Sequence, residues 1–174
     1  MMRKLFFSVV ALVIAGAVTL LLLHHNWNPV PADTTVDHIV VEKAARKLSI
    51  FRKGKQLKTY RIALGRNPIG HKEQEGDMRT PEGVYKIDYR NPNSDYHLSL
   101  HISYPSDEDN ARAAERGVPA GFDIMIHGLP NGRGWIGAAH LQEDWTAGCI
   151  AMTDEEIEEL WRIVPDGTTI DIRP

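Results

Sequence analysis

Two short stretches of the sequence carry residue types that could perform nucleophilic catalysis. Cys149 is the only cysteine and directly follows Gly148, while His127 lies upstream and directly precedes Gly128. A thiol is a strong nucleophile only as the thiolate, and a nearby imidazole or oriented backbone N–H groups can lower its pKa towards neutrality. Gly148 permits a tight turn that would direct N–H groups at an oxyanion. These residues predict a cysteine nucleophile with a histidine base, if the fold brings them together.

A structural interpretation of the same residues is also open. A single cysteine is often a small, buried and unreactive side chain. A single histidine often does no more than complete hydrogen bonds in the interior. One cysteine also excludes an internal disulfide and a thiolate metal cluster. The sequence context favours catalysis.

The sequence around the pair resembles the L,D-transpeptidase catalytic domain (YkuD-like) family. The family signature is a His-Gly followed, after a loop of similar length, by Ser/Thr-x-Gly-Cys and an apolar residue. Here these positions are residues 127–128 and 146–150. The likeness extends through residues 79–83 and 99–105, so it covers most of the chain after about residue 36. Two positions depart from the family pattern, because many members have histidine in place of Ala147 and arginine or asparagine in place of Ala151.

The resemblance implies a cell-wall enzyme that acts on peptidoglycan stem peptides. Such enzymes attack the amide between a diamino acid at position three and the terminal D-alanine, and they form a cysteine thioester. They then transfer the acyl group to an amine, which gives 3-3 cross-links or attaches proteins to the wall. In that scheme Cys149 is the nucleophile, His127 is the base, and the backbone N–H groups of Gly148 and Cys149 bind the oxyanion. The Gly128 carbonyl or the Asp144 carboxylate would orient His127, and the sequence does not choose between them.

Two other functions remain open from the sequence. An L,D-carboxypeptidase or endopeptidase would use the same residues with water in place of the amine, to hydrolyse stem peptides or to release a wall-bound protein. A catalytically silent wall-binding module would instead hold Cys149 buried and unreactive.

Stem peptides carry carboxylates, which an arginine binds through two parallel hydrogen bonds. Because Ala151 stands where many relatives have arginine, we expect this contact from Arg133, in the glycine-rich loop between the two catalytic motifs, or from Arg79. Arg133 is favoured because its loop begins at the catalytic histidine and must pass the site to reach the cysteine. Thr146 of the signature and His101, on the polar face of a predicted strand, are further candidates for substrate binding.

Composition narrows the range of cofactors and partners. His97 and His101 would share one face of a strand, but no third ligand stands at a suitable spacing, so we expect neither a metal nor another cofactor. The formal net charge of −3 argues against a nucleic-acid partner, which would favour a basic face. The 174 residues fit one globular domain of about 150 residues behind an N-terminal segment, and we expect a monomer.

The N-terminal residues predict attachment to a membrane or export across it. Arg3 and Lys4 precede an almost unbroken apolar run over residues 5–23, and a helix needs about 20 such residues to span a bilayer. We expect residues 1–26 to be a membrane anchor or a signal segment, residues 27–35 a linker, and residues 36–174 the catalytic domain. The basic residues would stay in the cytoplasm. The domain is therefore expected on the extracytoplasmic, periplasmic face, anchored to the inner membrane or secreted after cleavage.

The apolar pattern after the linker predicts a mainly β domain with two short helices (α+β). Alternation of apolar and polar residues predicts strands over residues 38–41, 47–51, 57–64, 84–89, 96–103, 121–126 and 168–172. Helices are expected over residues 107–116, with Asp107 as N-cap, and over residues 154–164, behind a capping box of Thr153 and Glu156. With the family resemblance, this gives an L,D-transpeptidase-like β-sandwich or sheet preceded by one N-terminal apolar helix. Residues 65–83 and 128–138 are expected to be loops.

Overall fold

A computed structural model describes residues 29–174 of the chain. The predicted N-terminal helix and the first residues of the predicted linker lie outside this range. Within the described range, no helix is long and apolar enough to cross a membrane.

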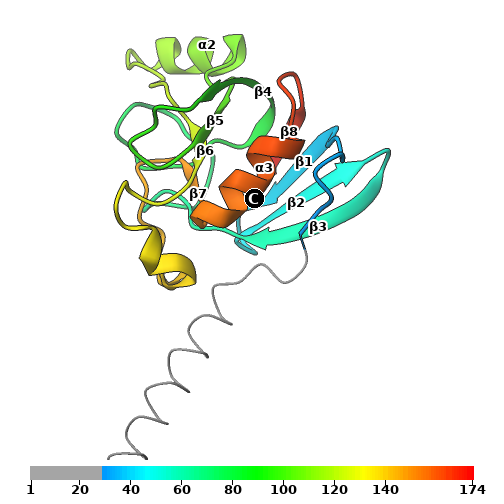
Figure 1. The fold of residues 1–174 in the computed structure, drawn as a ribbon. Coiled ribbons are helices and arrows are strands. Elements are labelled where there is room, and N and C mark those ends of the chain that lie inside the picture. Colours follow the sequence, from blue (N-terminus) through cyan, green and yellow to red (C-terminus); the bar gives the residue numbers. More distant parts are fainter. Residues whose placement is uncertain (1–28) are drawn as a thin grey trace, which may run out of the picture.

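The domain is built on one sheet of eight strands (Figure 1). Their order in space is β3-β2-β1-β8-β4-β5-β6-β7. The β1–β8 and β6–β7 pairs are parallel, and the other neighbours are antiparallel. The predicted mainly β fold is thereby confirmed. The strands are β1 His38–Glu42, β2 Lys47–Arg52, β3 Lys55–Arg61, β4 Gly83–Asn91, β5 Ser99–Ile102, β6 Met125–His127, β7 Ile150–Ala151 and β8 Thr169–Arg173.

Strand β4 joins the two halves of the sheet. Residues 83–86 pair with β8, and residues 87–91 pair with β5. The register of the second pairing shifts between Ile87 and Tyr89. Irregularities of this kind bend a strand and increase its twist. The half that contains β5, β6 and β7 therefore turns away from the half that contains β1, β2 and β3 (Figure 1).

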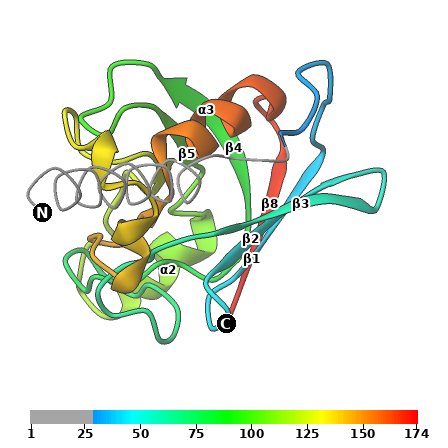
Figure 2. The same ribbon diagram turned by 60° about the horizontal axis from the view of Figure 1, so that its bottom comes forward.

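Three short helices complete the described fold, namely α2 (Asp107–Glu115), the 3-10 helix η1 (Gly134–Gln142) and α3 (Asp154–Ile163). Helix α3 contacts β5 and β6 and lies beside the centre of the sheet (Figure 2). Its buried residues Ile157, Leu160 and Ile163 belong to the main hydrophobic core. The two predicted helices are present. The helix η1 forms where a loop was expected, because its glycines and its lack of an apolar period give no helical signal.

The two α-helices begin with the same type of cap. The predicted capping box of α3 is present, since the Thr153 hydroxyl accepts from Glu156 N–H and the Glu156 carboxylate accepts from Thr153 N–H. The predicted N-cap of α2 is wrong by one residue. Ser106 is the N-cap, and its hydroxyl and backbone N–H exchange hydrogen bonds with Asp109. An aspartate at the third helical position thus takes the role usually filled by Glu or Gln.

Two strands begin at least three residues later than their apolar patterns predict. The strand expected over residues 96–103 begins only at Ser99, because His97 has a positive φ of 64° and its N–H donates to the Asn131 side chain. The strand expected over residues 121–126 begins only at Met125, because Asp123 has a positive φ of 56°. His127 is therefore the last residue of β6.

A short segment after β3 continues the sheet beyond β7. Ala63 and Ala151 exchange backbone hydrogen bonds of 2.9 and 2.8 Å, and Thr146 N–H donates to Leu64 O at 3.1 Å. Arg66 N–H then donates to Thr146 O at 3.0 Å. We call residues 63–66 the bracing segment and residues 146–149 the cysteine loop. The cysteine loop and β7 are thus held by β6 on one side and by the bracing segment on the other.

One buried lysine fixes the long loop of residues 65–82 to the sheet. Lys43, which is 1% exposed, donates to Gly70 O at 2.6 Å, to Thr80 O at 2.9 Å and to the Glu82 carboxylate at 2.8 Å. Burial lowers the pKa of Lys43, and the hydrogen bond that Lys43 donates to Glu82 opposes that shift. The sequence predicts only a polar loop over these residues. In the structure, the hydrogen bonds of Lys43 fix the backbone of this loop next to the bracing segment.

We expect Lys43→Met to lower the free energy of unfolding by about 3 kcal/mol, because it leaves Glu82 and two carbonyl oxygens without their donor. Urea denaturation at pH 7 measures the change. Lys47→Met, at an exposed position of β2, is the matched control and should stay within about 0.5 kcal/mol of the parent protein. Equal stability of the two variants would contradict the anchoring role of Lys43.

Candidate active site

Cys149 and His127 line the same cavity. The cavity has a volume of about 450 Å³ and lies between β6, the cysteine loop and the loop that follows β4. The fold thus brings together the two residues that the sequence singled out. The cavity is also lined by Arg66, Tyr96, Asp123, Met125, Trp145 and Thr146.

The register of two parallel strands explains how the two side chains meet. His127 of β6 lies opposite Ala151 of β7. Extending this register back places Cys149 opposite Met125, and Met125 N–H donates to Cys149 Sγ at 3.4 Å. Because strand side chains alternate, His127 and Cys149 project from the same face of the sheet, with their Cα atoms roughly 8 Å apart.

The backbone before the thiol requires glycine. Gly148 has φ of 137°, a conformation that side chains rarely adopt. A Cβ atom there would lie 2.7 Å from Arg79 O and 3.2 Å from the Ile124 side chain. The cysteine loop can therefore pass close to the 65–82 loop only because this position has no side chain.

His127 is held in one orientation. Its Nδ1 lies 2.7 Å from Gly128 O, and because a carbonyl only accepts hydrogen bonds, Nδ1 carries the proton. The other ring nitrogen, Nε2, makes no hydrogen bond within residues 29–174 and is left as an acceptor. Of the two orienting groups that the sequence left open, the structure selects Gly128. Asp144 instead binds Arg46 and Leu64 N–H.

Desolvation keeps both reactive groups neutral. Burial lowers the pKa of His127 to about 4, against a smaller opposing contribution from Gly128 O. Burial raises the pKa of the half-buried Cys149 thiol, although the hydrogen bond from Met125 acts in the opposite direction. The expectation of a thiol pKa lowered towards neutrality is therefore not met. At pH 7 the free protein holds a neutral thiol and a neutral imidazole.

Two aromatic residues pack around the histidine ring. The ring centroid of Tyr96 lies 4.5 Å from that of His127, and that of Trp145 lies 5.6 Å away at a steep angle. Trp145 Nε1 donates to His140 Nδ1 at 3.3 Å. These contacts exclude water from one side of the imidazole and contribute to the low pKa of His127. Neither aromatic residue was predicted from the sequence to contact His127.

The candidate oxyanion donors differ in availability. Gly148 N–H already donates to the Thr146 hydroxyl at 3.1 Å, which in turn donates to Cys149 O at 2.7 Å. Gly148 N–H, which the sequence predicts as an oxyanion donor, is therefore engaged within the cysteine loop. Cys149 N–H has no hydrogen-bond partner among the described residues. Thr146 uses its hydroxyl to hold the cysteine loop, and it also lines the cavity, where contact with substrate is expected.

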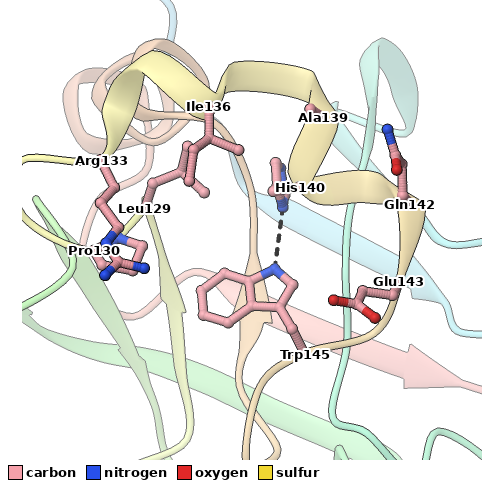
Figure 3. Close-up of a pocket in the computed structure, with 9 residues that line it drawn as sticks. All are labelled: Leu129, Pro130, Arg133, Ile136, Ala139, His140, Gln142, Glu143 and Trp145. Carbon is pink, nitrogen blue, oxygen red and sulfur yellow. Dashed lines mark hydrogen bonds between the residues drawn. The ribbon is translucent and has the colours of Figure 1, made fainter.

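The two arginines named from the sequence lie away from the catalytic cavity. The Arg79 guanidinium donates to His71 O at 3.2 Å and lies 3.4 Å from the Glu73 carboxylate. Arg133 lines a second cavity of about 560 Å³, to which Trp145 also contributes (Figure 3). Neither Cys149 nor His127 lines that second cavity.

Trp145 separates the two cavities, since it lines both of them. The second cavity also contains His140, whose ring points at Trp145 in Figure 3. Burial lowers the pKa of His140 to about 4, and the nearby His127 adds to the effect. Its Nε2 is buried and has no partner among the described residues.

His101 lies on the same sheet face as the catalytic residues but outside the cavity. Its Nδ1 lies 2.6 Å from the Asp88 carboxylate, and its ring stacks on Tyr89 with centroids 4.3 Å apart. It stands opposite Met125 in the β5–β6 pairing, whereas Ser99 stands opposite His127. Within residues 29–174 no group of three or more potential metal ligands occurs.

Comparison with known proteins identifies the family. The model of the YkuD L,D-transpeptidase catalytic domain matches residues 36–172. The chain therefore belongs to the L,D-transpeptidase catalytic domain family. The resemblance stated from residues 127–128 and 146–150 is thereby confirmed.

Relatives are known from several bacteria. The chain is 29% identical over 133 residues to YafK of Escherichia coli (strain K12), covering 73% of this chain and 46% of that protein. It is 26% identical to YqjB of Bacillus subtilis (strain 168), covering 82% of this chain and 73% of that protein. The chain thus spans about half the length of YafK.

Solved structures share the fold. The helical cell shape determining protein Pgp2 of Campylobacter jejuni is 27% identical, with a TM-score of 0.62, over 81% of this chain and 48% of that one. Bd1075 of Bdellovibrio bacteriovorus is 25% identical, with a TM-score of 0.55, over 83% of this chain and 50% of that one.

Because the thiol pKa is raised and the His127 pKa is lowered to about 4, we expect no thiolate–imidazolium pair in the free protein. The rate of Cys149 alkylation by iodoacetamide should rise continuously from pH 7 to pH 9, since the thiolate fraction grows throughout this range. His127→Ala should leave the rate at pH 7 within about threefold of the parent. A rate plateau around pH 6–7 that disappears in His127→Ala would contradict the neutral pair.

Proposed function

We propose that the protein catalyses cysteine-dependent acyl transfer on peptidoglycan stem peptides, as an L,D-transpeptidase. The observation that carries the proposal is the single cysteine, placed in one cavity with a histidine whose Nδ1 is fixed on Gly128 O. That arrangement leaves Nε2 as the base and Cys149 as the nucleophile. The family match supplies the class of substrate.

The first half of the reaction forms the thioester. The Cys149 thiol, which lies 3.5 Å from Asp123 O in the free protein, transfers its proton to His127 Nε2 as its sulfur attacks the carbonyl of the diamino acid. The resulting oxyanion accepts from Cys149 N–H, the donor left free by the Thr146–Gly148 contact. As the tetrahedral intermediate collapses, the C–N bond breaks and His127 returns the proton to the departing amine of D-alanine.

The second half of the reaction determines the product. An amine that loses its proton to His127 attacks the thioester and forms a new amide, while the thiolate leaves and recovers the proton. Water in the same position would give a carboxylic acid, so a carboxypeptidase or endopeptidase needs no other residue. The two activities differ only in the second nucleophile. The silent wall-binding module is disfavoured because Cys149 lines an open cavity instead of the core.

We expect Cys149→Ala to abolish turnover and to leave the fold intact, because it removes one half-buried sulfur atom and no core side chain. Purified tetrapeptide muropeptides are incubated with a soluble form of residues 29–174 and analysed by mass spectrometry. Cross-linked dimers identify a transpeptidase, and tripeptides identify a hydrolase.

A near-identical far-ultraviolet circular dichroism spectrum and melting temperature show that the Cys149→Ala variant is folded. Thr146→Ser keeps the hydroxyl of the cysteine loop and is the matched control that should retain activity. Turnover by Cys149→Ala above a trace would place the nucleophile elsewhere.

The apolar run of residues 5–23 further supports an extracytoplasmic domain tethered to the inner membrane. We expect the full chain to stay in the membrane fraction after washing with high salt, because about 20 apolar residues insert far more stably than a peripheral contact. A mature N-terminus near residue 33 would instead show cleavage and secretion. Release of the uncleaved protein by high salt would contradict both alternatives, the membrane anchor and the cleaved signal segment.

A further inference from the structure

Helix η1 contributes a single buried side chain, that of His140. Gly137 and His140 are the buried residues of this helix, and glycine has no side chain. The other side chains of η1 are exposed or only partly buried. His140 is 8% exposed and lines the second cavity but not the catalytic cavity. The packing of η1 against the site is therefore made through one histidine.

The His140 ring is unfavourable to bury. Trp145 Nε1–H donates to its Nδ1 at 3.3 Å, so Nδ1 is unprotonated and the neutral ring carries its proton on Nε2. Nε2 is buried and has no partner among the described residues. A buried donor without a partner is destabilising, and a leucine at this position would avoid that penalty. The contact with Trp145 is the only hydrogen bond that the His140 ring makes within residues 29–174.

Trp145 connects this hydrogen bond to the catalytic histidine. Its indole packs against the His127 ring with centroids 5.6 Å apart, and it lies 6.0 Å from the ring of Tyr96. Packing contacts of this kind leave an indole free to tilt, whereas a hydrogen bond is directional. Trp145 Nε1 has no other hydrogen-bond partner in the described part of the chain. His140 therefore fixes the tilt of the indole.

The tilt of Trp145 determines how much water reaches His127. Burial is the main cause of the low pKa of His127, and the indole provides part of that burial. Three charged side chains line the same cavity, namely Arg66, Asp95 and Asp123. None of them contacts His140, so a substitution at His140 leaves these charges in place. An indole that tilts away would admit water, which stabilises the imidazolium and competes for Nε2.

We propose that His140 is a positioning residue, which holds the Trp145 indole against His127 and so keeps the catalytic imidazole shielded from water and directed at Cys149. It acts through Trp145 and does not line the catalytic cavity. The proposal explains why a polar ring with an unpaired donor occupies the buried position of η1. It rests on the proposed function, because His127 is the base of that reaction.

Two substitutions of nearly equal shape separate the hydrogen bond from the packing. His140→Asn keeps an acceptor near the position of Nδ1, whereas His140→Leu removes it. With the full chain purified in detergent and tetrapeptide muropeptides as substrate, kcat should fall about tenfold in His140→Leu and stay within about threefold of the parent in His140→Asn. KM should change by less than about threefold in both. Gln142→Leu, at the exposed rim of the second cavity, is the matched control and should behave as the parent.

Urea denaturation distinguishes positioning from a purely structural role. His140→Leu buries no unpaired donor, so it should be at least as stable as His140→Asn. The inference therefore expects the less active of the two variants to be no less stable. If His140→Leu is instead as active as His140→Asn, the hydrogen bond to Trp145 has no part in catalysis and the inference is overturned.

A titration followed by nuclear magnetic resonance tests the inference without turnover. The ring C–H signals of His127, assigned by their loss in His127→Ala, should report a pKa of about 4 in the parent and in His140→Asn. The pKa should rise above about 5 in His140→Leu and in Trp145→Phe, which removes the donor, because water then stabilises the imidazolium. An unchanged His127 titration in both would overturn the inference. A raised pKa in a protein that turns over no stem peptide would support the role of His140 and refute the proposed function.

Discussion

The active site depends on backbone pairing at a strand of only two residues. Strand β7 is too short to be stable alone, yet β6 pairs with it on one side and Ala63 on the other. This double pairing fixes the cysteine loop, which Thr146 closes through its two hydroxyl contacts. The position of the thiol is thus determined by main-chain hydrogen bonds, which do not change with the conformation of surface side chains. Lys43 contributes indirectly to the position of the cysteine loop. It fixes the loop of residues 65–82, against which Gly148 packs.

Burial determines the charge state of the two residues of the proposed catalytic pair. The aromatic rings around His127 and the partial enclosure of Cys149 penalise charge on both, so a resting ion pair would cost more than it gains. In the proposed mechanism, proton transfer becomes favourable only as sulfur bonds to a carbonyl carbon, when the negative charge passes to an oxygen that faces Cys149 N–H. The free thiol is therefore protected from adventitious oxidation, which proceeds through the thiolate.

The sequence predicted both α-helices and most of the strands, because these depend on local patterns, but it did not predict the two-residue strand β7. Two short motifs singled out Cys149 and His127, which the structure places in one cavity. The sequence did not predict Arg66, whose place in the cavity results from pairing with a loop about 80 positions later. Arg133 was favoured because its loop passes the site, but η1 begins at the next residue and the side chain lines the second cavity. The choice of Gly128 over Asp144 as the partner of His127 was likewise a matter of backbone geometry, which residue types do not encode.

Trp145 is a single indole between two cavities, one of about 450 Å³ and the other of about 560 Å³. Its loss would merge them, and a change in its tilt would enlarge one at the expense of the other. The ring is also tied through His140 to the helix that borders the second cavity. A substitution of Trp145 that adapts either cavity to a new ligand would therefore also change the other cavity. It would change the surroundings of the His127 imidazole as well, because the Trp145 ring packs against it.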